Sequence, residues 1–135
     1  MKASAIRSIA ARQVLDSRGR PTVEVDVQHR ELAAGRWWEL PITEQLGNVG
    51  SEVSRAARWA SRNPETARAA LYRALELLDL TLADPRLRAS PGRLREIARA
   101  REVVVDFFDG PNQYHSTGPS LQKYFDAFAL AARRL

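Results

Sequence analysis

Residues 63–85 read NPETARAALYRALELLDLTLADP, and this stretch decides the fold class. Asn63 and Pro64 form a helix start, because asparagine is favoured at the N-cap and proline at the first helical position. The helix is predicted to stop before Pro85. Its apolar residues recur at helical spacing: Ala67, Leu71, Ala74, Leu75, Leu78 and Leu82. The stretch therefore predicts an amphipathic helix that packs one face on a core.

Three further helices are predicted on either side of this one. One covers roughly residues 43–61, one begins at Ser90-Pro91 and ends at Gly110-Pro111, and one opens at Gly118-Pro119. Their expected core faces are Leu46, Val49, Gly50, Val53, Ala57 and Ala60; then Leu94, Ile97, Ala98, Val104, Val105 and Phe108; then Leu121, Tyr124, Phe125, Phe128 and Ala132. Four helices with short connections predict a mainly α fold, an up-and-down antiparallel four-helix bundle over residues 37–135.

The N-terminal part has a different period. Residues 6–15 and 22–27 read as two strands, and the second alternates strictly, so that Val23, Val25 and Val27 share one face. A lone two-stranded hairpin is marginal in water. The hairpin, residues 1–27, must therefore pack on the helices, pair with another subunit or fray, and residues 28–36 form a linker.

Residues 6–27 resemble the N-terminal hairpin of the enolase family, chiefly through DSRG at 16–19 and PTVEV at 21–25. The family usually has Glu at the position of Gln13 and Asn at that of Arg20. The resemblance implies a subunit-interface role for Arg12 and Glu24. Enolase catalytic residues lie on a (β/α)₈ barrel, which takes about 250 residues. This chain has 135 residues, so no catalytic residue of the family can be carried over.

The helical part resembles small bacterial four-helix bundles of the HEPN and S23-like groups, through its helix lengths, Trp59 and the segments 75–82 and 101–108. HEPN ribonucleases use an arginine followed four to six residues later by a histidine. Neither His29 nor His115 has an arginine at that distance upstream. The resemblance therefore implies the fold without the nuclease chemistry.

Composition narrows the functional classes. The chain has no cysteine, which excludes disulfides and thiolate chemistry. No apolar stretch is long enough for a membrane span, so we expect a cytoplasmic protein with no membrane partner. The net charge is +5, of which residues 1–36 contribute +3 (seven Lys or Arg against four Asp or Glu), so the helical part is nearly balanced. Bulk charge is thus a weak argument for nucleic acid.

Arg101 is the most informative residue of the helical part, because it falls on an apolar stripe. A buried guanidinium requires a carboxylate partner. Asp79 is the leading candidate by its helical position, with Glu76 and Glu52 as alternatives. The group is either an ion pair that fixes helix register or an anion pocket between helices.

Other polar patterns are weaker. Glu76 and Asp79 resemble half of the carboxylate set of all-α nucleotide pyrophosphatases, but the partner pair on the preceding helix is missing, so no metal and no cofactor are expected. The polar loop 109–118 is a possible small binding surface, with His115 as a solvated residue. Arg93, Arg95 and Arg99 form either a solvated helix start or a phosphate-binding patch.

Trp37 and Trp38 either close one end of the bundle or anchor a partner. Taken together, the sequence predicts a non-enzymatic binding or assembly module that is a homo-oligomer, and we expect a dimer in contact through the hairpin edge and these tryptophans. One alternative is an RNA- or nucleotide-binding bundle that uses Arg95, Arg99 and Arg101. Another is an enolase-family fragment without activity.

Overall fold

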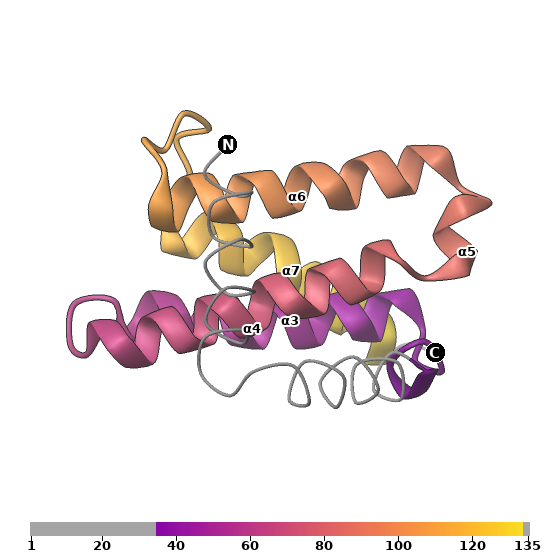
Figure 1. Cartoon of the computed structure of the whole chain (residues 1–135), viewed down its shortest axis with the longest axis horizontal. Helices are drawn as coiled ribbons and strands as arrows, with labels where there is room; N and C mark the ends of the chain where they lie inside the picture. Colours follow the sequence, from indigo (N-terminus) through magenta and orange to yellow (C-terminus); the bar gives the residue numbers. More distant parts are fainter. Residues whose placement is uncertain (1–34, 134–135) are drawn as a thin grey trace, which may run out of the picture.

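A computed structural model describes residues 35–133, and this part of the chain is mainly helical (Figure 1). The mainly α fold class is confirmed for these residues. The predicted hairpin at 6–27, with Arg12 and Glu24, lies outside the described residues, as does the predicted linker up to residue 34. The helices are α3 (Ile42–Trp59), α4 (Pro64–Leu82), α5 (Pro85–Arg88), α6 (Pro91–Asp109) and α7 (Gly118–Arg133).

Proline occupies the first position of α4, α5 and α6, where its missing N–H removes no helical hydrogen bond. Asn63 caps α4 as predicted, and its side-chain oxygen accepts a hydrogen bond from the backbone N–H of Thr66 at 3.2 Å. Ser90 precedes α6 in the same position but makes no capping hydrogen bond. The predicted helix start at Ser90-Pro91 is therefore confirmed, without the capping hydrogen bond that Asn63 makes.

The predicted apolar faces form one core, with two corrections. In α3 Ala56 is buried in the core, whereas the predicted core residues Ala57 and Ala60 are half-buried and exposed, respectively. In α6 Ala98 is exposed and Ala100 is buried. The reason is the same in both helices. Each residue advances the helix by about 100°, so alanines at neighbouring positions face different directions. Only those that face a neighbouring helix are buried.

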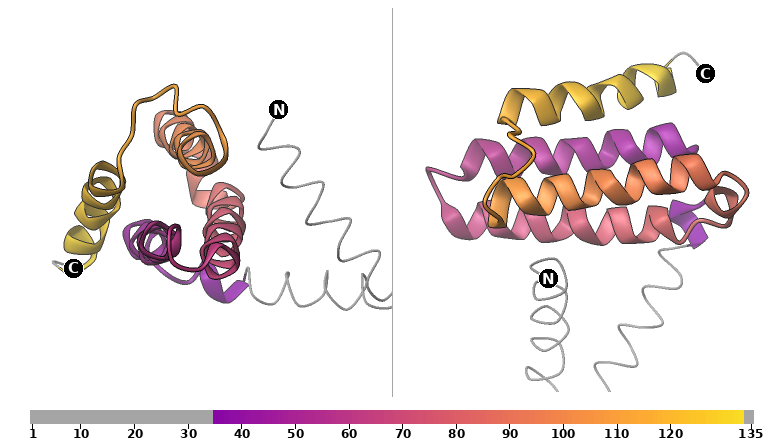
Figure 2. Two further views of the ribbon diagram at one scale, coloured as in Figure 1. Left: turned by 90° about the vertical axis from the view of Figure 1, so that its left-hand side faces the viewer. Right: turned by 90° about the horizontal axis from the view of Figure 1, so that it is seen from above.

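The long helices form an arc in which successive helices alternate in direction (Figure 2). α3 packs against α4 on one side and α7 on the other, and α6 lies on α4. α6 and α7, at the two ends of the arc, do not pack closely against each other. The helical faces therefore enclose a core on three sides and leave the fourth side open.

Two glycines of α3 set the approach of α7. A Cβ built on Gly50 would lie 2.4 Å from Cβ of Phe125, and one built on Gly47 would lie 3.2 Å from Cα of Ala129. No side chain fits at Gly50, so α7 contacts the backbone of α3 there. None of the described helices is long and apolar enough to cross a membrane.

Candidate functional site

The open side of the arc holds a cavity of about 550 Å³ between α6 and α7. We call it the α6–α7 cavity. The cavity arises because α6 packs against α4 while α7 packs against α3, so that the facing surfaces of α6 and α7 stay apart. Its lining residues are Gly92, Arg95, Glu96, Arg99, Ala100, Val103, Ser116, Ser120, Leu121, Tyr124 and Phe125.

The walls of the cavity are mainly apolar and come from both helices. Phe125 and Leu121 are 1% and 5% exposed, so α7 presents residues that also belong to the core. Ala100 and Val103 contribute the facing wall from α6. The ring of Tyr124 packs edge-on against Phe125, with 5.1 Å between the ring centroids. Such a surface suits hydrocarbon or aromatic groups.

One hydrogen bond crosses the cavity. The Tyr124 hydroxyl on α7 donates to Oε1 of Glu96 on α6, at 3.1 Å. Burial raises the pKa of the Tyr124 hydroxyl, and the nearby Glu96 carboxylate raises it further. The phenol therefore stays protonated at physiological pH, and its proton is directed to the carboxylate.

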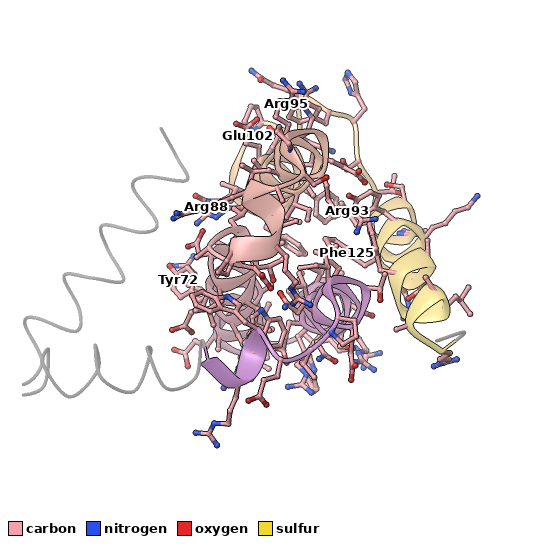
Figure 3. The ribbon with its side chains drawn as sticks, turned by 90° about the vertical axis from the view of Figure 1, so that its right-hand side faces the viewer. Tyr72, Arg88, Arg93, Arg95, Glu102 and Phe125 are labelled. Carbon is pink, nitrogen blue, oxygen red and sulfur yellow. The ribbon has the colours of Figure 1, made fainter. Side chains whose placement is uncertain are left out.

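Two arginines line the same cavity from α6. Arg95 and Arg99 lie one turn apart and are both exposed. Within residues 35–133 neither makes a hydrogen bond or an ion pair with another side chain. Figure 3 shows Arg95 at the outer edge of α6 and Phe125 between α7 and α3. The cavity thus combines an apolar interior with cationic groups at its edge.

The loop between α6 and α7 closes one end of the cavity with Ser116. Ser116 and Asn112 exchange two hydrogen bonds, each 2.9 Å long. Asn112 and His115 have left-handed backbone conformations, with φ of 57° and 53°. Asparagine and histidine tolerate that region better than most residues. His115 itself is exposed, in agreement with a solvated loop residue.

The first turn of α7 is held by a reciprocal cap. The backbone N–H of Ser120 donates to Oγ1 of Thr117 at 3.0 Å, and the N–H of Thr117 donates to Oγ of Ser120 at 2.9 Å. This arrangement is a capping box with serine at its third position. It fixes the start of α7 and so places Leu121 on the cavity wall.

The predicted pair of Arg101 and Asp79 forms. Nε of Arg101 lies 2.8 Å from Oδ1 of Asp79, and its Nη2 lies 3.3 Å from Oδ2. Arg101 is 8% exposed. Among the described residues neither alternative carboxylate joins this pair, because Glu76 is exposed and Glu52 lies 3.8 Å from Arg55. Whether the pair also holds an anion stays a prediction.

Removing the two partners of this pair is expected to have unequal effects. Asp79→Ala should lower the free energy of unfolding by about 1–2 kcal/mol, because it leaves a buried guanidinium without its carboxylate. Arg101→Met should change it by less than about 1 kcal/mol, because a methionine fills the apolar stripe and the remaining carboxylate is 36% exposed to water. Urea unfolding of both variants measures the difference, and a larger loss for Arg101→Met would contradict it.

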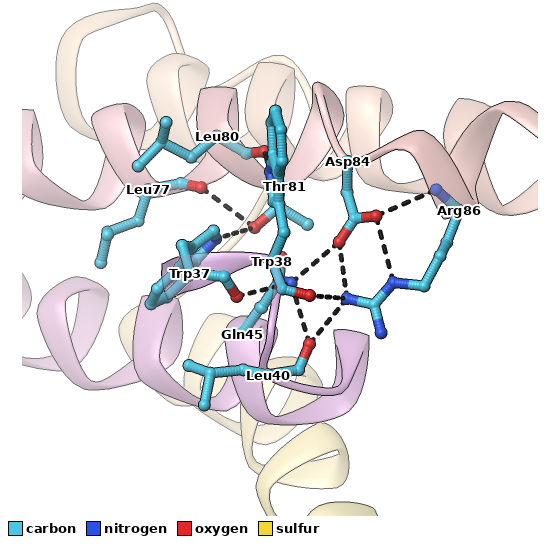
Figure 4. Close-up of polar contacts among 9 residues, drawn as sticks. All are labelled: Trp37, Trp38, Leu40, Gln45, Leu77, Leu80, Thr81, Asp84 and Arg86. Atoms are coloured by element: carbon cyan, nitrogen blue, oxygen red, sulfur yellow. Dashed lines mark hydrogen bonds and ion pairs between the residues drawn. The ribbon is translucent and has the colours of Figure 1, made fainter. Parts of the chain in front are cut away.

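Trp37 and Trp38 are held against the end of α4 (Figure 4). The indole N–H of Trp37 donates to Oγ1 of Thr81 at 3.0 Å, and that of Trp38 donates to the carbonyl of Leu80 at 2.7 Å. Both rings are half-buried. This placement agrees with the end-closing alternative, and a partner-binding role for the two rings stays a prediction.

The same end of the molecule contains a polar cluster that the sequence analysis missed. Asp84 is 1% exposed and its Oδ2 accepts hydrogen bonds from Gln45 at 3.0 Å and from Arg86 at 2.6 Å. Arg86 also donates to the carbonyls of Trp38 and Leu40. The Arg86 guanidinium holds the pKa of Asp84 below its ordinary value, against the opposing effect of burial. The available signal was Asp84 before Pro85, an N-cap pattern that starts α5.

The predicted patch of Arg93, Arg95 and Arg99 is exposed, whereas Arg101 is engaged by Asp79. The nucleotide-binding alternative therefore loses Arg101 as a free cation. No group of three or more acidic or histidine side chains that could hold a metal occurs among the described residues.

No protein-family model matches the chain, and comparison with solved structures finds no match. The resemblances to enolases and to HEPN-type bundles therefore stay predictions.

Proposed function

We propose that the chain is a non-enzymatic binding module that holds a small, largely apolar ligand in the α6–α7 cavity. In this proposal the long helices are an up-and-down four-helix bundle that is open between its third and fourth members. The supporting observation is the cavity of about 550 Å³, which falls within the usual range of small-molecule sites, roughly 300–1,000 Å³.

The lining residues also support binding over structural packing alone. Leu121 and Phe125 are anchored in the core, so the cavity wall is preformed and a ligand need not order it. Six of the eleven lining residues carry a polar side chain, and two of these, Tyr124 and Glu96, are held by the hydrogen bond between them, as in sites where fixed polar groups orient a ligand. The proposal keeps the non-enzymatic binding role expected from the sequence and moves it from the tryptophans to the cavity.

Binding of an uncharged fluorescent probe, N-phenyl-1-naphthylamine, tests the proposal. The full chain should bind the probe. Val103→Trp should weaken probe binding at least tenfold, because the indole would fill part of the cavity next to Ala100. Ala69→Trp adds the same side chain at an exposed position of α4 and should leave binding unchanged. Circular dichroism checks that both variants fold. Absence of probe binding, or equal binding by Val103→Trp, would contradict the proposal.

A further inference from the structure

The geometry points to an amphipathic monoanion as the ligand, namely a hydrocarbon chain that ends in one carboxylate. This inference rests on the proposed function and assigns the chemistry of its ligand. The hydrocarbon lies along Ala100, Val103, Leu121 and Phe125, and the carboxylate is bound by Arg95 and Arg99.

The head group is assigned by charge. Arg95 and Arg99 are four residues apart, so their guanidinium groups extend from the same face of α6. A guanidinium matches a carboxylate through paired N–H donors. With Glu96, the only acidic residue of the lining, the two arginines leave a net charge of +1. One negative charge on the ligand balances it.

The Tyr124 hydroxyl supports the assignment of an anionic head group, because it already donates a hydrogen bond to the Glu96 carboxylate. The hydrogen bond of 3.1 Å directs the phenol proton to the carboxylate of Glu96. That carboxylate is thereby stabilised within the protein and competes less with a ligand for the arginines. By contrast, Arg86 and Arg101 have carboxylate partners at 2.6 and 2.8 Å, whereas Arg95 and Arg99 have no carboxylate partner among the described residues and are exposed at the cavity.

The tail is assigned by the apolar wall. The apolar and aromatic lining residues are Ala100 and Val103 on α6 and Leu121, Tyr124 and Phe125 on α7, while the charged side chains of Arg95, Glu96 and Arg99 lie on the α6 stretch that precedes Ala100. An alkyl chain that lies along this wall removes its methylenes from water. Each added methylene should tighten binding by about fourfold until the wall is covered. Affinity should therefore rise with chain length from hexanoate to octanoate to decanoate.

Three ligands with the same chain and different heads test the inference: decanoate, decanol and decyltrimethylammonium, each below its micellar concentration. Displacement of N-phenyl-1-naphthylamine from the full chain gives the affinities. Decanoate should bind at least tenfold more tightly than decanol, and the cation should bind most weakly. Equal affinities for decanoate and decanol would overturn the inference.

Charge reversal locates the head group. The double variant Arg95→Glu, Arg99→Glu should lose the preference for decanoate over decanol and bind the cation better, with the affinity of the uncharged probe measured separately for each variant. The matched control Arg68→Glu, Arg73→Glu makes the same charge change at exposed positions of α4 and should keep the preference. Loss of the preference in both double variants would overturn the inference, because bulk charge would then explain it.

The two proposals fail separately. If the uncharged probe binds and Val103→Trp weakens it, but the three heads are not distinguished, the binding function stands and the monoanion is wrong. If neither probe nor decanoate binds, both are wrong. If adenosine monophosphate or a short single-stranded RNA displaces the probe more strongly than decanoate, a phosphate ligand replaces the carboxylate and the inference is overturned.

Discussion

Gly50→Ala is expected to lower the free energy of unfolding by about 1–3 kcal/mol, the range for overpacking a well-packed contact. The new Cβ would lie 2.4 Å from Cβ of Phe125. Both atoms are attached directly to the backbone, so no side-chain rotation relieves the overlap, and α3 or α7 must move. Phe125 is 1% exposed, so this movement also opens the core.

A series of glycine variants in urea unfolding measures this effect. Gly47→Ala should lower stability less, because its nearest atom is Cα of Ala129 at 3.2 Å. Gly92→Ala is the control, since it is also in a helix but has nothing within 4 Å. The expected order of destabilisation is Gly50, then Gly47, then Gly92. Equal unfolding midpoints for Gly50→Ala and Gly92→Ala would contradict the close α3–α7 contact.

The same contact couples the fold to the α6–α7 cavity. Phe125 packs against Gly50 of α3, and it also lines the cavity together with Leu121 and Tyr124. If α7 moves away from α3, the wall moves with it. Gly50→Ala should therefore weaken probe binding as well as stability, whereas Asp79→Ala should affect stability without moving the cavity wall.

Much of the helical part could be predicted because its signals are local. Asn63 with Pro64 starts a helix, and the apolar stripe that follows identifies the face of α4 that is buried. The same stripe logic placed Arg101 toward the interior and selected Asp79 as its partner, and the two form an ion pair. Helical phase alone determines which side chains of one helix share a face.

The cavity could not be predicted in this way. The spacing of apolar residues in α6 shows that one face of the helix is apolar. Whether another helix covers that face depends on the distance between the packed helices, which the spacing does not give. Ala98 was expected inside and is exposed, while Ala100 and Val103 line the cavity. The missing information was the close α3–α7 approach at Gly50, which holds α7 on α3 and away from α6.

Asp84 was missed for a related reason. A single aspartate before a proline is typical of a helix cap, and α5 does begin there. Its burial arises because Gln45 from α3 and Arg86 both approach it. Gln45 is separated from Asp84 by a whole helix hairpin in the sequence, so no local pattern reveals the contact.

Asp84→Asn is expected to lower the free energy of unfolding at pH 7 by about 2–4 kcal/mol. The change removes the charge that satisfies Arg86 and weakens the acceptor of the Gln45 amide, within a site that is 1% exposed. Arg86 stays half-exposed, so water solvates part of the guanidinium and keeps the loss below that of a fully buried pair. Asp126→Asn, at an exposed position of α7, should be close to neutral.

The pH dependence provides the sharper test of this carboxylate. The pKa of Asp84 is lower in the folded protein than its ordinary value, chiefly through the hydrogen bonds from Arg86. The unfolded chain therefore takes up the proton first as the pH falls. The stabilisation is complete above the ordinary pKa of about 3.9 and is lost as the pH passes below it toward the folded-state value. Urea unfolding at pH 7, 5 and 3 should show the difference between wild type and Asp84→Asn unchanged from 7 to 5 and smaller at 3. A difference that stays constant down to pH 3 would mean that shape and packing, rather than the charge, hold Trp38 and Leu40 at this end of the molecule.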